Sequence, residues 1–309
     1  MSYQDNLLIT LNSKYSTVIN GSLKSSVNFD FISILKEEDD IIRSYISVVN
    51  AQIPMSYYLI TSTNNKLSYN TQSPIFIQDL YVPVGNYNSY TLCEKLISLF
   101  LAQGIIINIT VSSINGLINF AQSSSIFLIY PYQVYPSNLI ISSIAPLIGL
   151  TNTTIYSGTS ITGNYPVNLL GTKRIKIKSS ALAINSLSSV NSSYNNTIAI
   201  IPVDNSFFSL INYENKNELN KNIIKVSTIE NLDIQLTDDD DNLINFNNFD
   251  WALTLCISIE RKEKVKDNIT LKDILKHTLI LNTEDKMNLE VVEEKILTQD
   301  EKDLQLLQK

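Results

Sequence analysis

Charged side chains are scarce in this sequence of 309 residues, since Asp, Glu, Lys and Arg make up only 17% of it, against roughly 25% in an average soluble chain. Acidic residues outnumber basic ones and give a formal net charge of -7. No stretch combines dense Lys and Arg with aromatic residues. Nucleic acid is bound by basic, aromatic-lined surfaces, so we expect no direct contact with it.

Histidine is almost absent as well. The single residue, His277, lies in a charged C-terminal segment, where we interpret it as solvent-exposed. A Ser or Cys nucleophile in the rest of the chain therefore lacks the usual general base. No nucleophile–base pair or metal-binding cluster stands out, so we expect neither an enzyme nor a cofactor.

Cysteine is limited to Cys93 and Cys256, which we interpret as reduced thiols in a helix and a core strand. The longest apolar run, residues 96–111, is interrupted by polar residues and is shorter than the roughly 20 residues a bilayer requires, so we predict no membrane span. The first residues lack the pattern of a signal peptide, from which we expect synthesis in a cytoplasm.

Apolar and aromatic residues are abundant, with 16 Tyr and 10 Phe among Asn, Ser and Thr, a mixture typical of short β-strands joined by polar turns. The chain is therefore expected to be mainly β. Patterns of strand length predict strands at residues 6–11, 27–31, 41–53, 57–60, 74–82, 174–178, 197–202, 207–213, 223–227, 232–237 and 251–259. In the last of these, Trp251, Leu253, Leu255, Ile257 and Ile259 share one face, and we interpret Trp251 as a core anchor.

The middle of the chain has a different pattern. Leucines at helical spacing predict an amphipathic helix over residues 91–103, ended by Gly104. A hairpin follows at 105–120 with Gly116 in its turn, then a third strand at 126–130 and a short helix at 142–148. We therefore predict an inserted α+β subdomain over residues 83–150, within a β body formed by residues 1–82 and 151–261. Residues 151–166, rich in Gly, Thr, Ser and Asn, are expected to form a loop.

After Arg261 the composition changes to interleaved Lys and Glu without aromatics. We predict a charged helical tail over residues 262–309, with an amphipathic helix at about 285–307. Its apolar surface is too small to fold alone, so it docks on its own domain or on a partner, or frays.

Two motifs resemble ligand-binding loops, but we interpret them as a plain loop and a turn. Residues 158–164 have the glycine spacing of a phosphate loop, but Asn164 and Tyr165 stand where Lys and Ser or Thr are needed. The run Asp238 to Asp241 suggests weak calcium binding, with Asp238 and Asp240 as the candidate ligands, but the EF-hand glycine and glutamate are missing. We interpret it as a solvated acidic turn.

Several stretches resemble the single jelly-roll penton and minor capsid proteins of virophages, Polinton-like viruses and large nucleocytoplasmic DNA viruses. They are residues 11–17, 20–22, 27–35, 46–58 and 64–65 near the N-terminus, 85–92 and 147–150 in the middle, and 232–255 near the end. Within or beside these stretches we expect a structural role for Pro54, Gly85, Phe246, Asp250, Trp251, Leu253 and Leu255. The family usually has Gly where this chain has Asp241, and often Gly before Asp250, where Asn248 and Phe249 stand. Asp and Asn tolerate left-handed backbone better than most residues.

The resemblance implies a single jelly-roll β-sandwich in the capsid of a virion, assembled in the host cytoplasm. Five copies form a homopentamer, the penton, at each icosahedral vertex and contact major capsid capsomers and other minor capsid proteins. The first alternative is a minor capsid or cement protein beneath the shell. The second is a β-sandwich carbohydrate-binding adhesion module, which requires Trp251 and surface tyrosines to form an exposed platform.

Overall fold

The computed structural model describes residues 2–262 except 20–22, 36–39, 72–76, 123–125, 132–142, 152–154, 181, 183–185, 188–193, 218–219 and 225–227. Residues 4–261 form one compact unit. The predicted tail therefore lies outside the described residues, apart from Lys262. No helix in the described part is both long and apolar enough to cross a bilayer.

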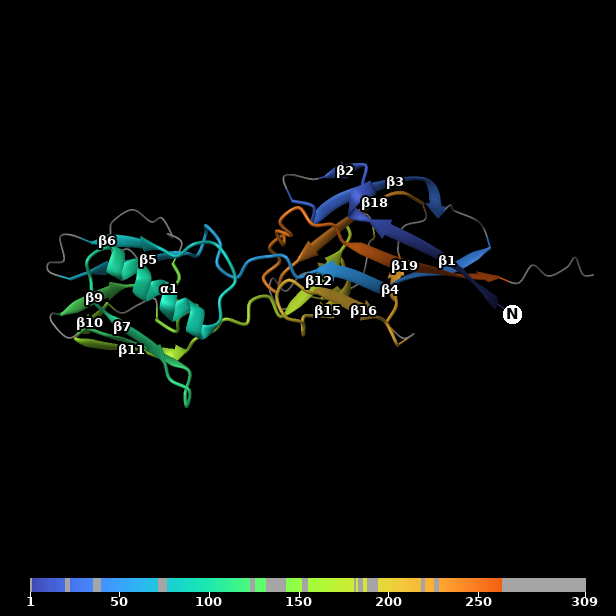
Figure 1. Cartoon of the computed structure of the whole chain (residues 1–309). Coiled ribbons are helices and arrows are strands. Elements are labelled where there is room, and N and C mark those ends of the chain that lie inside the picture. The colour runs from blue at the N-terminus through green and yellow to red at the C-terminus, as the bar shows by residue number, and fades with distance from the viewer. Residues whose placement is uncertain are drawn as a thin grey trace, which may run out of the picture. The chain divides into compact units, whose positions relative to one another are not determined.

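Two five-stranded sheets form the body of the protein (Figure 1). The first has the order β1 (Ser2–Asn12), β19 (Ala252–Lys262), β4 (Ile41–Pro54) and β16 (Leu210–Glu214), and β17 (Asn222–Ile224) also pairs with β4. The second has the order β15 (Thr197–Pro202), β12 (Arg174–Lys178), β18 (Ile229–Thr237), β3 (Ser26–Leu35) and β2 (Val18–Ile19).

The strand order is that of a jelly roll. In chain order the main strands of the body are β1, β3, β4, β12, β15, β16 with β17, β18 and β19. Numbered one to eight, they give one sheet with the order 1-8-3-6 and another with the order 2-7-4-5. Two interlocked Greek keys produce this arrangement. The jelly-roll fold predicted from the sequence resemblance is thus confirmed.

The body's core lies between these sheets because both supply alternating apolar residues to it. In β19, Leu253, Leu255 and Ile257 are at most 1% exposed, which confirms the predicted apolar face. The thiol of Cys256 faces the other side and is half-buried, and it is free, as is that of Cys93.

A second core belongs to the inserted subdomain, which we define as residues 59–169, in the connection from β4 to β12. One of its sheets has the order β10 (Tyr156–Gly158), β9 (Phe127–Tyr130), β5 (Lys66–Asn70) and β6 (Gln78–Tyr81). The other has the order β11 (Ser160–Pro166), β8 (Leu117–Ala121) and β7 (Asn108–Val111). A helix, α1 (Ser89–Ala102), packs its apolar face onto this core.

Helix α1 begins at a capping box, in which the Asn88 side chain accepts a hydrogen bond from the Thr91 backbone and the Thr91 hydroxyl accepts one from the Asn88 backbone. Its buried side includes Leu96 and Phe100, and the chain turns away at Gly104 with φ of 76°. The helix predicted at 91–103 is confirmed.

The subdomain is larger than the predicted residues 83–150. Strand β5 pairs with β9 and with β6, none of which belongs to the jelly-roll sheets, and β11 pairs with β8. The prediction that residues 151–166 form a loop is therefore wrong, as is the placement of residues 126–130 beside the β7–β8 hairpin. Residues 144–149 form turns and not a helix; Pro146 lacks the amide hydrogen that a helix interior requires.

Three short elements complete the described chain. They are a 3-10 turn at Ser13–Tyr15 and the strands β13 (Ser186–Leu187) and β14 (Tyr194–Asn195), which pair with each other.

Candidate functional site

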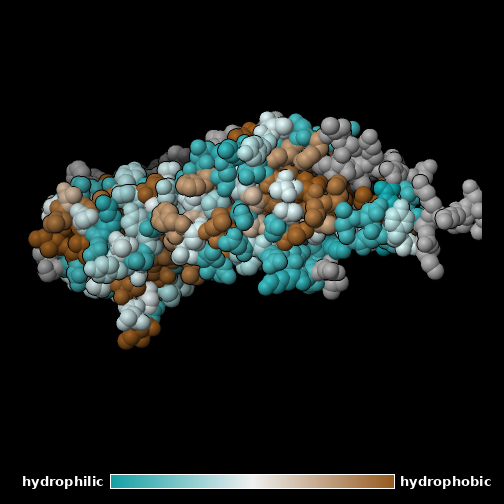
Figure 2. All heavy atoms as spheres, turned by 45° about the vertical axis from the view of Figure 1, so that its right-hand side comes forward, coloured by the Kyte–Doolittle hydropathy of each residue, from teal (hydrophilic) through white to brown (hydrophobic). Residues whose placement is uncertain are grey.

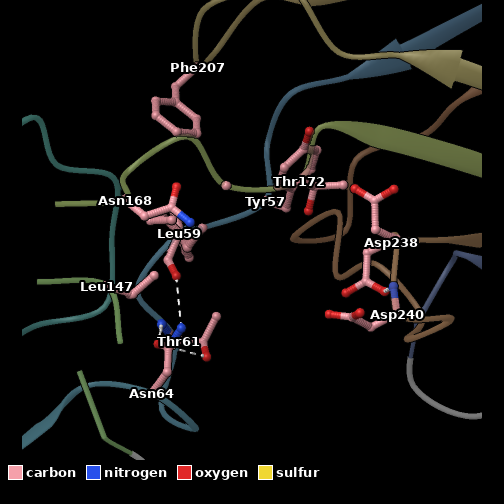
Figure 3. A pocket seen from close by; sticks show the side chains of 13 residues that line it. Tyr57, Leu59, Thr61, Asn64, Leu147, Asn168, Thr172, Phe207, Asp238 and Asp240 are labelled. Carbon is pink, nitrogen blue, oxygen red and sulfur yellow. Dashed lines mark hydrogen bonds between the residues drawn. The ribbon is translucent and has the colours of Figure 1, made fainter. Parts of the chain in front are cut away.

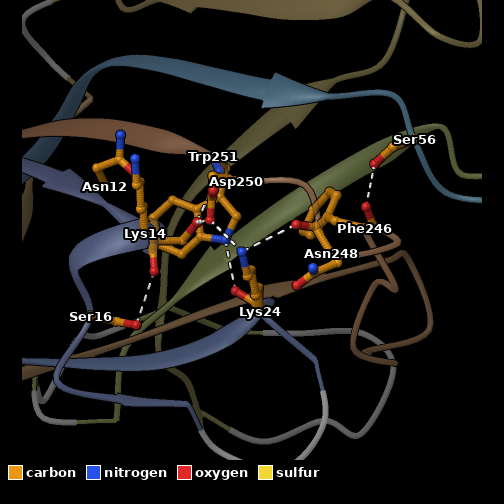
Figure 4. Close-up of polar contacts among 10 residues, drawn as sticks. Asn12, Lys14, Ser16, Lys24, Ser56, Phe246, Asn248, Asp250 and Trp251 are labelled. Atoms are coloured by element: carbon orange, nitrogen blue, oxygen red, sulfur yellow. Dashed lines mark hydrogen bonds and ion pairs between the residues drawn. The ribbon is translucent and has the colours of Figure 1, made fainter.

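The dipeptide Asp250–Trp251 ties the start of the last strand to the N-terminal part of the jelly roll (Figure 4). Trp251 is 1% exposed, and its indole Nε1 donates to the Lys24 carbonyl at 2.8 Å. The Trp251 amide donates to the Ser13 hydroxyl, and the Ser13 amide donates to the Trp251 carbonyl, each at 3.0 Å. The Phe29 ring packs edge-on against the indole. The predicted core position of Trp251 is confirmed.

The charged Asp250 carboxylate also belongs to this cluster. Its Oδ1 atom accepts hydrogen bonds from the Lys24 ammonium at 2.8 Å and from the Ser13 hydroxyl at 3.0 Å. Mainly because of the Lys24 contact, the pKa of the Asp250 carboxyl is lowered. The Lys24 ammonium also donates to the Asn248 carbonyl. Asp250 therefore acts as an acceptor that joins two separate segments of the jelly roll.

Phe246, Pro54 and Gly85 lie at or near connections between chain segments. Phe246 is 1% exposed, and its carbonyl accepts from the Ser56 hydroxyl at 2.6 Å (Figure 4). Pro54 ends β4, opposite Leu210 of β16. Gly85 and Ile60 exchange two backbone hydrogen bonds at 2.9 and 3.0 Å.

The burial of Trp251 excludes the predicted carbohydrate-binding adhesion module, because that module requires Trp251 to be exposed. A carbohydrate platform requires an aromatic face open to solvent, whereas the indole here lies in the jelly-roll core. The adhesion module built on Trp251 is therefore wrong.

The acidic turn does not gather its carboxylates around one point. Asp238 accepts hydrogen bonds from the Asp240 and Asn242 amides, whereas Asp241 binds the Lys176 ammonium at 2.8 Å and Lys178 at 2.7 Å. These lysine contacts lower the pKa of the Asp241 carboxyl. Among the described residues, no three His, Cys, Asp or Glu side chains are grouped as a metal site requires.

Asp238, Asp239 and Asp240 line one side of a cavity of about 360 Å³ (Figure 3). Leu59, Thr61 and Asn64 lie across it, and the rings of Tyr57, Tyr58 and Phe207 also contribute to its wall. The cavity combines aromatic faces with carboxylates, but the Asp238 side chain is already used within its own turn.

The sequence contains one further signal that composition as a whole conceals. No Asp, Glu, Lys, Arg or His occurs between Leu96 and Thr172. The inserted subdomain has four charged residues, Lys66, Asp79, Glu94 and Lys95, and a net charge of zero. Two of them form an ion pair at 2.7 Å, in which Lys66 is buried. Counting charges by region, and not over the whole chain, reveals this uncharged segment and the neutral subdomain that contains it.

No protein-family model matches the chain. No curated protein matches its sequence. Among solved structures, the mavirus penton protein has a TM-score of 0.45 and 11% identity, covering 84% of this chain and 99% of the mavirus chain. A chain in the cryo-EM structure of the Sputnik virophage has a TM-score of 0.38 and 13% identity, covering 84% and 98%.

Proposed function

We propose that this chain is a structural protein of an icosahedral viral capsid, and specifically the penton protein that forms pentamers at the vertices. The supporting observation is that stretches resembling capsid proteins, residues 27–35, 46–58 and 232–255, lie in strands of the jelly roll. These strands are β3, β4, β18 and β19. Jelly rolls also occur in lectins and cupins, so the strand order does not choose among these functions. The stretches favour a capsid protein.

The proposed activity is assembly and not catalysis. In a ring with cyclic symmetry each copy presents one flank to the next, and the rotation between copies closes the ring after five. The outer surface of the ring then contacts major capsid capsomers within the virion, and assembly takes place in the host cytoplasm. No covalent chemistry or cofactor is required for this activity.

Rigidity of the jelly roll serves such a role because loosely held surfaces lose conformational entropy on association. The Asp250–Trp251 cluster joins β19 to segments more than 220 residues earlier in the chain. It therefore holds together the start and the end of the sandwich before any partner binds.

We also propose that the tail, residues 262–309, binds a neighbouring capsid subunit. The sequence predicts an amphipathic helix at about residues 285–307, without enough apolar residues for a core of its own. A chain ending at Arg261 should fold with unchanged Trp251 fluorescence but assemble poorly. Unfolding of this shortened chain is the result that contradicts the proposal.

Solution mass tests the penton assignment directly. Light scattering of the purified chain, with negative-stain images of the same sample, should give closed rings of about 174 kDa, five copies of the 34.8 kDa chain. Capsids containing the chain between capsomers, and not at vertices, would instead assign the minor capsid role. A chain that forms no ring alone or with its capsomers would contradict the penton assignment.

A further inference from the structure

The inserted subdomain differs from the rest of the molecule in charge. Its net charge is zero, so the chain's net charge of -7 lies entirely outside residues 59–169. When two copies approach through other regions, their net negative charges repel each other, whereas two inserted subdomains approach without net repulsion. The charge distribution thus favours contact through this subdomain.

The exposed face of the β11–β8–β7 sheet is built from small neutral side chains. Thr110 and Thr162 lie on either side of Asn119 in one cross-strand row. Both threonines are exposed, while Ile109 and Ile161 beside them point into the core. The face therefore presents hydroxyl and amide groups without a charged or bulky side chain in this row.

This row is also held in place before any partner binds. The Asn119 amide nitrogen donates to the Thr162 hydroxyl at 2.9 Å and to the Ser160 hydroxyl at 3.0 Å. Side chains already ordered by such contacts lose little further freedom on association.

Exposed apolar residues occur close in sequence to β7 and β8. Ile106, two residues before β7, is 78% exposed, and Ile126, five residues after β8, is 59% exposed. Ile114, in the β7–β8 turn, is 96% exposed. Figure 2 shows hydrophobic patches on this subdomain, including one at the tip of a projecting turn. Burying such residues supplies a favourable free energy of association.

The segment that includes β7 has the composition of a strand that pairs readily. Residues 105–111 are Ile-Ile-Ile-Asn-Ile-Thr-Val, with no charge and no proline, and β7 ends its sheet among the described strands. Natural edge strands commonly carry a charged residue that discourages association. None is present here, which favours contact with another chain.

We propose that this neutral surface, the exposed face of the β11–β8–β7 sheet, is a self-association surface that binds the inserted subdomain of a second copy. The partner is argued from charge, because a surface without charges is matched by another uncharged surface, and this subdomain itself supplies one. The inference rests on the proposed function only in that both require the chain to self-associate.

The experiment places charges of either sign on the surface of the full-length chain. Sedimentation velocity over a range of concentrations compares the wild type with T110K/T162K, T110D/T162D and T110S/T162S. The control, Q52K/N231K, adds the same two positive charges as T110K/T162K, but at exposed neutral positions of the jelly roll. Circular dichroism melts establish that each variant is folded, and the serine variant keeps the surface neutral if a charged variant unfolds.

Both the lysine and the aspartate variant should weaken self-association about tenfold or more, because either charge loses hydration against an uncharged partner. The serine and jelly-roll variants should remain within about threefold of the wild type. Opposite effects of lysine and aspartate would reveal a charged partner surface and overturn the proposal. So would an equal loss in the jelly-roll control, or a wild type that stays monomeric.

These outcomes separate this proposal from the penton assignment. Five-membered rings that tolerate both charged variants would retain the penton function and reject the neutral surface. Dimers that both charged variants disrupt would retain the surface and reject the ring.

Discussion

The jelly roll and the inserted subdomain have similar apolar cores but differ in the charge of their surfaces. Each has β-sheets around its own apolar core, and each core includes side chains that are completely buried. The jelly roll supports its turns with ion pairs, such as those from Lys176 and Lys178 to Asp241. The subdomain supports its face with amide and hydroxyl contacts, such as those of Asn119. Stability of a core therefore does not dictate the charge of the surface around it.

The largest expected effect tests whether the two cores are energetically separate. Phe100→Ala should lower the free energy of unfolding of the inserted subdomain by about 3–5 kcal/mol, because the ring is completely buried against Tyr69 and Phe127. Trp251 is the only tryptophan and lies in the jelly roll, so its fluorescence reports that region alone. Denaturation followed by circular dichroism should shift, whereas the fluorescence midpoint should not.

The matched control is Leu101→Ala, which changes a residue that is 61% exposed on the same helix, and it should cost less than about 0.5 kcal/mol. Equal shifts of both signals in Phe100→Ala would show that the two cores unfold as one.

The reciprocal change is Leu255→Ala in β19. Leu255 is completely buried in the jelly-roll core, so its truncation should cost about 2–5 kcal/mol. Here the Trp251 fluorescence midpoint should move to lower denaturant. A midpoint equal to that of the wild type would contradict a core role for Leu255.

A smaller effect concerns the ion pair between Lys66 and Asp79 in the subdomain. Asp79→Asn should destabilise the subdomain by about 1–3 kcal/mol, because the buried Lys66 ammonium loses its carboxylate partner. Replacing Lys66 by Met in the same chain should recover part of that loss, since no buried charge then remains. Circular dichroism of the single and double variants measures this difference, and a double variant less stable than Asp79→Asn would refute it.

The smallest effect is a pH dependence in the jelly roll. The folded-state pKa of Asp250 is lowered, so this carboxylate contributes stability at neutral pH that is lost as pH falls below about 4. Asp250→Asn should therefore lower stability at pH 7 by up to about 1 kcal/mol and leave it nearly unchanged at pH 2.5. The Trp251 fluorescence midpoints at the two pH values test this, and a loss of equal size at both would exclude the ionic explanation.

The sequence predicted those strands and helices whose residue pattern lies within the element itself. The alternation in β19 and the leucine spacing of α1 identified their buried faces. The expected tolerance of left-handed backbone also agrees with the structure, since φ is 68° at Asp241 and 67° at Asn248.

Pairing between distant strands was not predictable in the same way. Strand β5 pairs with β9 on one side and β6 on the other, and nothing within these short strands specifies that they join each other and not the jelly roll. The boundary predicted at residue 83 was therefore too late. Similarly, Trp251 was recognised as a core residue, but its partners Ser13 and Lys24 lie 238 and 227 residues away.

The place where the subdomain enters has a consequence for how such proteins diversify. Every described strand pairing within the two jelly-roll sheets joins residues outside 59–169. One continuous gene segment thus encodes a module that recombination can exchange without breaking any of these pairings. Lineages that share the same scaffold are then free to acquire unrelated modules at this single position, each with its own surface.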